Sequence, residues 1–566
     1  MKNHVKILLG FMIAGALMAG MSEDFSLAAT GKAGSSPAVV SVDMDDAVSR
    51  IMSIGQKENS VMDHLYHLTK NIGPRMAGSD NHREATQWAR DRFEDLGLTD
   101  AHLEKAALLP VGFNRGVSTG SIVAPVEKDL HFYTPAWSAG TPGAKRAPAV
   151  AAPDSPDELR SMRARFEDSW VLRPGFTDLE SYEAYMRAWD ALEVDIAGEI
   201  LPSGGKLIHS FGNPDLEWED LPKTPKVILL ETEWENIAGM LDEGREVYLE
   251  FDIQNHFVKG PVPVYNVVAD IPGREIPDEY VIVGAHIDSW DMGEGALDNG
   301  TGVAAAIEAA RIIMESGARP RRTVRFILFA GEEVGMLGSK AYTADHPDLL
   351  PRISAVLNMD KGSDYIRGID ATNEMEEDFE SVFFPVRSLD PDKPFEIKVA
   401  EHLPEVVDCG GEIDPETKKL TSGCGGGMVK IIRCGEDGTT TSVTAEELND
   451  HPAFTETSAC ASLIAEEPSG EDPPTGRGAK KVIKSLGSSD HAAFLSVGVP
   501  AFMWNQSGEV PYGKHIHTEN DKLDKVVPEY KEHSSTVIAL AAYGIANLDH
   551  LLSRENLLAE LEEGLE

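Results

Sequence analysis

Short hydrophobic runs recur along the middle of the chain, and they predict the strands of a sheet. The runs are Val264–Ala269, Val281–Ala285, Val324–Phe329 and Ile353–Leu357. A continuous apolar run of this length, bounded by polar residues, is typical of a buried strand. The last three runs lead into acidic residues, and open α/β sheets bind ligands at the carboxyl ends of their parallel strands. The sequence therefore predicts an α/β fold with a site at this edge of the sheet.

Apolar residues at helical spacing predict helices between these strands. One stripe follows the second run: Val303, Ala306, Ile307, Ala310 and Met314. Another stripe lies nearer the N-terminus, with Gly97 placed as its C-cap: Ala85, Trp88, Ala89, Phe93 and Leu96. Residues 45–69 and 529–561 are also predicted to be helical. The helix after the second strand would set the site on a rigid strand–turn–helix unit.

The polar residues after the second strand have the make-up of a metal site. His286, Asp288 and, beyond several glycines, Asp298 follow the run Val281–Ala285. Imidazole and carboxylate groups are the ligands of zinc and similar ions, and a nearby carboxylate often accepts the second N–H of a metal-bound histidine. We predict that His286 and Asp298 bind metal and that Asp288 orients His286.

The following strands add candidate ligands. One leads to the adjacent Glu332 and Glu333, and the next leads to Asp360. Adjacent glutamates at a strand end allow one to bind metal while the other stays free as a general base. Far along the chain, His517 stands in a polar segment that could complete the set. The alternatives to His517 are His515 and His491.

This set of residues resembles the co-catalytic di-zinc aminopeptidase family, and its motif is most similar to the plasma glutamate carboxypeptidase branch. The resemblance is carried by His286-Ile287-Asp288-Ser289-Trp290-Asp291, followed by Gly293, Gly295, Ala296 and Asp298. It implies two Zn2+ ions per chain. Asp298 would bridge the ions, His286 and Asp360 would bind one of them, and Glu333 and His517 would bind the other. Glu332 would be the catalytic base, Asp288 would be a second catalytic residue, and Asp521 would support His517. It also implies a cis peptide bond between Asp298 and Asn299.

The resemblance further implies a three-layer αβα zinc exopeptidase core with a central mixed sheet and an inserted β-rich protease-associated domain. Composition changes at two stretches, one rich in Pro and Ala and one containing all the cysteines. The expected division is a signal peptide at 1–28, a first catalytic part at 29–139, the protease-associated domain at 140–257, and a second catalytic part at 258–566 with a Cys-containing insertion at about 397–481.

On this basis we expect a secreted zinc-dependent exopeptidase of the aminopeptidase or dipeptidase type. A water activated by two metal ions would attack the terminal peptide bond of a peptide or dipeptide while Glu332 accepts its proton. Two alternatives stay open: a glutaminyl-cyclase-like acyltransferase with a single zinc ion, and a transferrin-receptor-like protein that binds partners without catalysis. The sequence does not decide which end of the substrate is recognised.

Composition limits which partners the protein can bind and in which compartment it is expected. The chain has 94 acidic and 51 basic residues and a net charge of -43, which disfavours nucleic acid and anionic membrane surfaces. Lys2 and Lys6 precede an apolar run at 7–19, which predicts export to a secreted or periplasmic location without a stable membrane anchor. In an exported chain four clustered cysteines predict two disulfides: Cys409, Cys424, Cys434 and Cys460. Assembly into a homodimer stays open.

Overall fold

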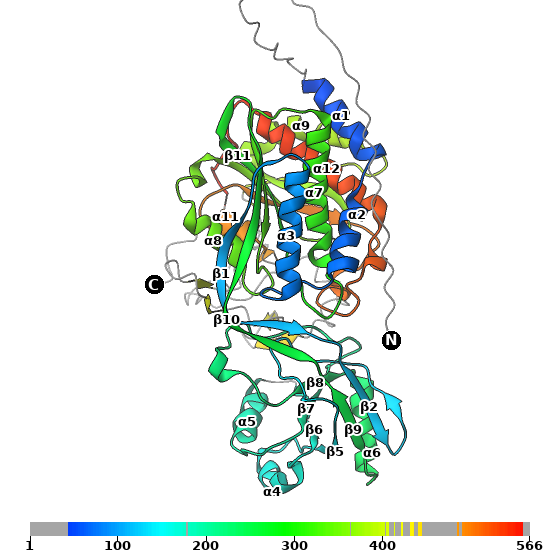
Figure 1. The fold of residues 1–566 in the computed structure, drawn as a ribbon. Coiled ribbons are helices and arrows are strands. Elements are labelled where there is room, and N and C mark those ends of the chain that lie inside the picture. The colour runs from blue at the N-terminus through cyan, green and yellow to red at the C-terminus, as the bar shows by residue number, and fades with distance from the viewer. Residues whose placement is uncertain are drawn as a thin grey trace, which may run out of the picture. The chain divides into compact units, whose positions relative to one another are not determined.

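The computed structural model describes residues 44–176, 179–362, 364–401, 403 and 489–557, together with six short strands between 405 and 485. Within these residues, two eight-stranded mixed sheets contain most of the strands (Figure 1). The predicted signal peptide lies outside the described residues, as do three of the cysteines and the side chain of the fourth. The signal peptide and the disulfides therefore stay predictions.

The first sheet contains the strands that the hydrophobic runs predicted. Its members are β1 (Thr99–Arg115), β10 (Asn255–Ile271), β11 (Ile276–His286), β12 (Arg322–Phe329), β13 (Ile353–Asn358), β14 (Tyr365–Thr372), β15 (Glu396–Ala400) and β22 (Ala501–Ser507). They lie in the order β1-β10-β12-β11-β13-β22-β14-β15. β12, β11, β13 and β22 run parallel to one another, whereas β10 pairs antiparallel with both of its neighbours. The sheet is mixed, as predicted.

Helices cover both faces of this sheet. They are α1 (Met44–Lys57), α2 (Val61–Tyr66), α3 (Asp80–Asp95), α7 (Thr301–Ser316), α8 (Leu337–Asp345), α9 (Glu376–Phe383), α11 (His491–Leu495) and α12 (Pro528–Asn547). α3, α7, α9 and α12 cover one face, with α1 and α2 packed on α7 and α12. α8 and α11 pack together on the other face, on the far side of the strands from α3 and α7 in Figure 1. The predicted three-layer arrangement is confirmed.

Helix α7 is buried along almost its whole length, and this fixes the segment that precedes it. Gly302 stands in its first turn, where a Cβ would lie 2.2 Å from Oδ1 of Asn299 and 2.4 Å from the carbonyl oxygen of Met359. Only glycine allows the start of the helix to approach the chain beyond β13 so closely. The helix ends before Gly317, which adopts a left-handed conformation with φ of 67°.

The predicted helix at 45–69 is wrong in one respect, because the chain forms two α-helices there. The Asn59 side chain accepts the backbone N–H of Val61 (3.0 Å), and the intervening N–H donates to Glu308 (2.9 Å). These bonds replace helical ones, since Asn side chains compete for backbone groups. α12 likewise ends at Asn547, short of the predicted boundary.

A second sheet is built from strands that fall between β1 and β10 in sequence. Its strands are β2 (Thr119–Ala124), β3 (Lys128–Asp129), β4 (Phe132–Tyr133), β5 (Lys145–Ala151), β6 (Trp170–Leu172), β7 (Gly198–Pro202), β8 (Lys226–Leu229) and β9 (Tyr248–Asp252). Their order is β3-β2-β9-β5-β6-β7-β8-β4, and the accompanying helices are α4 (Pro156–Phe166), α5 (Leu179–Asp190) and α6 (Glu231–Asp242). The sheet has its own apolar core, in which the rings of Trp170 and Phe251 meet edge to face at 4.6 Å. It begins at β2, upstream of the expected boundary at 140, because such short strands give little periodic signal.

Shorter elements complete the described chain. The helical turns are η1 (His67–Ile72), η2 (Trp218–Asp220), η3 (Ala296–Gly300), η4 (Leu350–Arg352), η5 (Asn373–Met375), η6 (Val386–Ser388), η9 (Tyr512–Lys514) and η10 (Leu523–Lys525). The paired short strands are β16 (Glu405–Val406) with β21 (Lys484–Ser485), β17 (Glu412–Ile413) with β18 (Leu420–Ser422), and β19 (Ile431–Cys434) with β20 (Thr440–Val443). Among the helices of the described residues, none is long and apolar enough to cross a membrane.

Candidate metal centre

Three neighbouring parallel strands deliver the candidate residues to one edge of the first sheet. His286 is the last residue of β11, Glu332 and Glu333 follow β12, and Asp360 follows β13. Asp298 comes from η3, directly before α7, and His517 comes from the chain between η9 and η10. Because parallel strands place their carboxyl ends at the same edge, residues far apart in sequence meet there.

The two carboxylate oxygens of Asp298 face two different histidines. Oδ1 lies 3.1 Å from Nε2 of His286, and Oδ2 lies 3.1 Å from Nε2 of His517. Nε2 of His286 also lies 3.3 Å from Oδ1 of Asp360, and Nε2 of His517 lies 3.0 Å from Oε2 of Glu333. The five predicted ligands therefore form two clusters that share Asp298.

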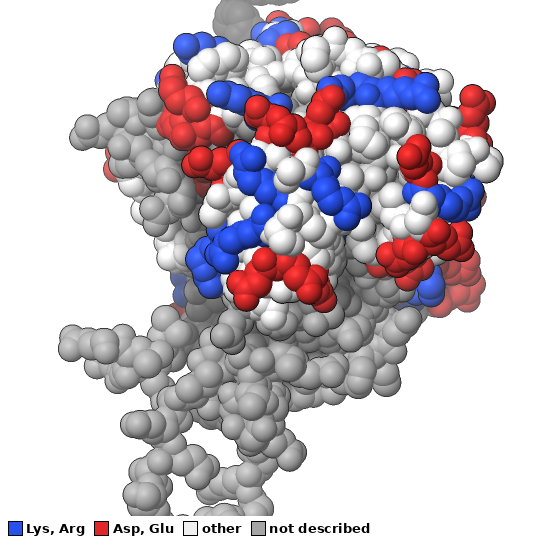
Figure 2. All heavy atoms as spheres, turned by 90° about the horizontal axis from the view of Figure 1, so that it is seen from below, with Lys and Arg blue, Asp and Glu red and all other residues white. Residues whose placement is uncertain are grey.

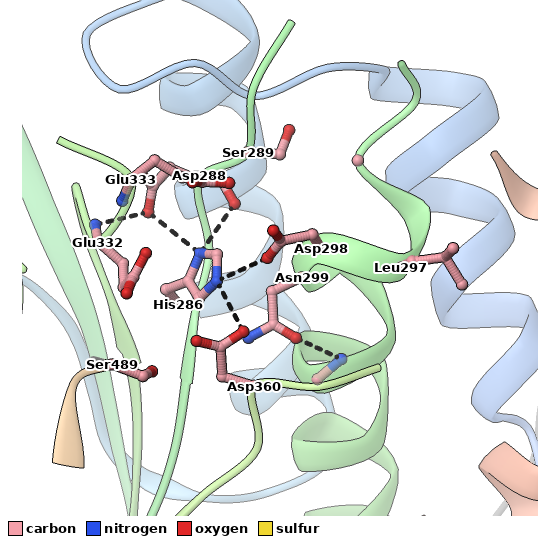
Figure 3. Close-up of polar contacts among 12 residues, drawn as sticks. His286, Asp288, Ser289, Leu297, Asp298, Asn299, Glu332, Glu333, Asp360 and Ser489 are labelled. Carbon is pink, nitrogen blue, oxygen red and sulfur yellow. Dashed lines mark hydrogen bonds and ion pairs between the residues drawn. The ribbon is translucent and has the colours of Figure 1, made fainter. Parts of the chain in front are cut away.

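Asp288 contacts residues of both clusters without being one of the five predicted ligands. The carbonyl oxygen of Asp288 lies 3.2 Å from Nδ1 of His286, and its Oδ1 lies 3.6 Å from the same atom. Its carboxylate also accepts the backbone N–H groups of Glu332 (3.1 Å) and Glu333 (3.2 Å). Figure 3 shows His286 between Asp288 on one side and Asp298 and Asp360 on the other. If Nδ1 of His286 carries the proton, the unprotonated Nε2 faces the carboxylates of Asp298 and Asp360.

Glu332 and Glu333 differ in their surroundings although they are adjacent. Glu333 is buried, whereas Glu332 is partly exposed beside His286 and Asp360. The largely enclosed position of the Glu332 carboxylate raises its pKa well above its usual range; His286 opposes this shift, and the neighbouring carboxylates of Asp360 and Glu333 add to it. Glu332 is therefore able to hold a proton.

The crowding of acids in the centre fits a bound cation. Burial raises the pKa of Glu333 to about 7, and Asp298 contributes to the same shift. Burial disfavours a charged ring at His286 and at His517, yet the surrounding carboxylates outweigh it and raise both pKa values well above the usual range. Oε1 of Glu333 is buried without a hydrogen-bond partner among the described residues. Histidine nitrogens, carboxylate oxygens and an unpartnered buried oxygen together are a donor set that suits zinc.

Asp521 contacts the main chain at Asp298. Its Oδ1 accepts the N–H of Leu297 (2.5 Å), and its Oδ2 accepts the N–H of Asp298 (3.3 Å). It thus holds the backbone of the shared carboxylate, a role that the sequence did not predict. The peptide bond between Asp298 and Asn299 is cis, as predicted.

Three residues near the centre were not predicted. Ser210 belongs to the second sheet's part of the chain, and both its N–H and its Oγ donate to the carbonyl oxygen of His517 (2.7 and 3.0 Å). Burial raises the pKa of Tyr512 well above its usual range, and the acids of both clusters raise it further, so its hydroxyl stays protonated. The third residue, Arg75, binds the loop between His286 and Asp298. No periodicity or motif spacing marks these residues, because their partners are distant in sequence.

Comparison with known proteins identifies the family. The sequence model of peptidase family M28 matches residues 266–392, a range that includes four of the five candidate ligands. Carboxypeptidase Q of Mus musculus is 28% identical over 336 residues, which are 58% of this chain and 71% of the relative. Residues 266–392 of the chain therefore match peptidase family M28, and carboxypeptidase Q is among its relatives.

A further relative and a solved structure are also similar to this chain. A probable zinc metalloprotease of Pyrenophora teres f. teres is 32% identical to this chain over 121 residues, 20% of this chain and 26% of the relative. The crystal structure of a peptidase M28 precursor from Shewanella amazonensis has the same fold, with a TM-score of 0.56, 22% identity, and coverage of 90% of this chain and 98% of that one. The prediction of a metallopeptidase is confirmed at the level of the family, while the roles of individual residues stay predictions.

Proposed function

We propose that this M28 peptidase is an exopeptidase that holds two zinc ions in the two clusters joined by Asp298. The observation that carries the proposal is the orientation of Asp298, whose two oxygens each face a separate histidine–acid pair. A carboxylate in this position is suited to bridge two ions, as in two-metal hydrolases. His286 and Asp360 would hold one ion, and Glu333 and His517 would hold the other.

When bound, a pair of zinc ions supplies Lewis-acid chemistry, because it lowers the pKa of a shared water and polarises the scissile carbonyl group. Glu332 accepts the proton of the attacking water and returns it to the departing amine. Asp288 accepts the backbone N–H of Glu332 and thereby keeps the Glu332 carboxylate beside His286. Asp521 fixes the backbone of Asp298, so the shared ligand needs little rearrangement.

The substrate, the second sheet and the location extend this proposal. Peptides or dipeptides are the substrates that family membership supports, and the name of carboxypeptidase Q supports recognition of a terminal residue. The second sheet would be a protease-associated domain, since it stands as a separate module between β1 and β10. The basic residues and apolar run at the N-terminus support secretion.

Metal analysis of the purified chain and two variants tests the proposal. We expect two zinc ions per chain. Asp298→Asn should weaken both ions, because one amide oxygen cannot bridge as a carboxylate does, whereas Glu333→Gln should mainly affect one. Asp378→Asn is a matched control, since it removes a carboxylate 3.0 Å from Nε2 of His550 at a surface pair. Equal metal loss in Asp378→Asn would contradict the assignment.

Cleavage assays then separate the peptidase from the two alternatives. A peptide library with amino-blocked and carboxyl-blocked members would show which free end is required. One zinc ion at full activity, or cyclisation of amino-terminal glutamine without cleavage, would indicate a cyclase. Stable binding of peptides without turnover would indicate a binding protein.

A further inference from the structure

We propose that Arg75 is a positioning residue of the metal centre, which fixes the separation of His286 and Asp298 by binding the main chain between them. The inference rests on the proposed function, because it concerns the same two ligands. Arg75 belongs to the segment 73–79, which interrupts the helices at the start of the chain. Its contacts, its charge and its surroundings each support the proposal.

Within the described part of the chain, the hydrogen bonds of the guanidinium group all go to carbonyl oxygens of the main chain. Nε donates to the carbonyl of Ile287 (2.9 Å), and Nη2 donates to that of Gly295 (2.8 Å). Nη1 donates to the carbonyls of Gly73 (3.2 Å) and Glu294 (3.4 Å). One planar group therefore ties the residue after His286 to a residue close before Asp298.

A second pair of bonds fastens Arg75 to the same loop. Its backbone N–H donates to Oγ of Ser289 (3.0 Å), and its carbonyl accepts the N–H of Ser289 (3.3 Å). Gly295 completes the fit: a Cβ at this position would lie 2.3 Å from Oγ of Ser289 and 3.0 Å from Nη2 of Arg75. With φ of 60°, Gly295 also adopts a conformation that L side chains rarely take. The loop is thus shaped around the guanidinium group.

The positive charge of Arg75 is compatible with its buried position next to the acid-rich centre. The residue is completely buried, and buried cations are normally paired with a carboxylate at contact distance. Burial lowers the pKa of Arg75 to about 10, while Asp521, Asp288, Asp298 and Glu333 oppose that shift, so the group stays protonated at neutral pH. Arg75 therefore places a permanent positive charge behind an acid-rich centre without competing for its ligand oxygens.

The shape of the side chain matters as much as its charge. A guanidinium group presents donors in a rigid planar fork, whereas lysine offers a compact ammonium on a flexible stem. Arg75→Lys keeps the charge but cannot reach Ile287 and Gly295 together. Groups that orient metal ligands typically change metal affinity by about 10–100-fold when they are replaced.

The experiment compares Arg75→Lys with Arg554→Lys in the full chain. Arg554 is a matched control, because its guanidinium group likewise donates to main-chain carbonyls, those of Leu350, Ile353 and Gly498, at the opposite end of β13. Zinc affinity is measured by competition with a chromophoric chelator, and the cobalt-substituted protein is examined by visible absorption. We expect a loss of zinc affinity of at least about tenfold and an altered cobalt spectrum for Arg75→Lys, with neither change for Arg554→Lys.

Two further variants keep the test decisive if Arg75→Lys does not fold. Gly295→Ala leaves Arg75 in place but pushes the loop away from it, and should produce the same spectral change. Gly204→Ala is its control, since Gly204 has φ of 74° and an added Cβ there would meet no atom of the described residues within 4 Å. Wild-type zinc affinity and an unchanged cobalt spectrum in Arg75→Lys or Gly295→Ala would overturn the inference. Failure of the unaltered chain to bind two zinc ions would instead refute the proposed function.

Discussion

At the scale of single residues, Glu332 and Glu333 show how neighbours in sequence acquire different chemistry. The backbone N–H groups of both donate to the same carboxylate, that of Asp288. Their side chains nevertheless diverge, because Glu333 contacts His517 while Glu332 lies beside His286 and Asp360. One glutamate is therefore placed to bind metal and the other to exchange a proton.

Replacing Glu332 with alanine should reduce hydrolysis by roughly two to four orders of magnitude, the usual effect of losing a positioned base. Zinc content should stay at the wild-type value, because Glu332 is not among the proposed ligands. Steady-state assays and metal analysis of the same preparation measure both. In the contrasting variant Glu333→Ala, zinc content should fall as well. If Glu332→Ala loses zinc while Glu333→Ala retains it, the two roles are reversed.

Lys531 is a second residue with an unusual environment. It is completely buried in α12, where Nζ donates to the carbonyl oxygens of Gly362 and Asp364 in the segment after Asp360. Burial lowers its pKa from 10.5 to about 7. The unfolded chain therefore holds this proton more tightly than the folded protein does between these two pH values.

The stability contributed at Lys531 should consequently be present at high pH and be lost as the pH falls from about 10 to about 7. Within this window each pH unit changes the free energy of unfolding by up to about 1.4 kcal/mol. Urea unfolding at about pH 7, 8.5 and 10 measures it, with Lys531→Met as the variant that lacks the titration. Stability relative to wild type should thus rise for Lys531→Met as the pH is lowered. The control variant Lys223→Met, which replaces an exposed lysine, should show no such change in stability relative to wild type. Parallel pH profiles of the free energy of unfolding for wild type and Lys531→Met would rule the explanation out.

At the scale of elements, the second sheet's part of the chain contacts both loops that flank the metal centre. Tyr133 of β4 donates its hydroxyl to the carboxylate of Asp291 (2.7 Å), which also binds Nε (2.9 Å) and Nη2 (3.2 Å) of Arg115 at the end of β1. On the other loop, Ser210 binds the carbonyl of His517. His517 itself adopts φ of 55°, an uncommon conformation for a residue with a side chain.

Replacing Arg115 with methionine should lower the free energy of unfolding by about 3 kcal/mol, because the largely buried Asp291 would lose its cation. Urea unfolding provides the measurement. Arg245→Met is the comparison, since Arg245 pairs with Glu243 at 3.7 Å on the surface and such pairs contribute about 0–1 kcal/mol. Equal effects of the two substitutions would show that the buried pair contributes no more to the free energy of unfolding than the surface pair does.

The sequence predicted elements better than it predicted contacts between them. β11, β12 and β13 each contain a short, mainly apolar run, and α7 has a clear apolar stripe, so the strands and the helix were recognisable without tertiary information. Four of the five proposed ligands lie at or next to the ends of these elements, and all five matched a family pattern. Arg75 and Ser210 could not be found in this way, because each binds main-chain carbonyls, which leave no trace in the identity of the partner residue.

At the scale of the whole molecule, the net charge of -43 contrasts with a locally mixed surface. Figure 2 shows a face on which Lys and Arg side chains lie among Asp and Glu side chains. α4 illustrates the mixing, with Asp157 and Glu158 in its first turn and Arg163 and Arg165 in its last. Opposite charges that are close neighbours compensate one another, but the excess of carboxylates still repels over longer distances.

We expect the melting temperature to rise when NaCl is increased from about 20 mM to about 500 mM at about pH 8, because salt screens the long-range repulsion. Differential scanning calorimetry of the chain loaded with zinc measures the change. The rise should shrink at about pH 5, where part of the carboxylates are protonated, and choline chloride should act like NaCl. A melting temperature that falls with salt would show that local ion pairs outweigh the net charge.

The pairing of β1 with β10 has a consequence for how this gene was assembled. The two strands pair antiparallel up to Arg115 opposite Asn255, and all strands of the second sheet lie between these residues in sequence. Paired strands lie about 4.8 Å apart, a gap that a two-residue turn closes. A shorter ancestor with a plain hairpin at this point could therefore have gained the whole second sheet in a single insertion. On that view the bond from Ser210 to His517 joins the loop that carries His517 to a segment that the ancestor lacked.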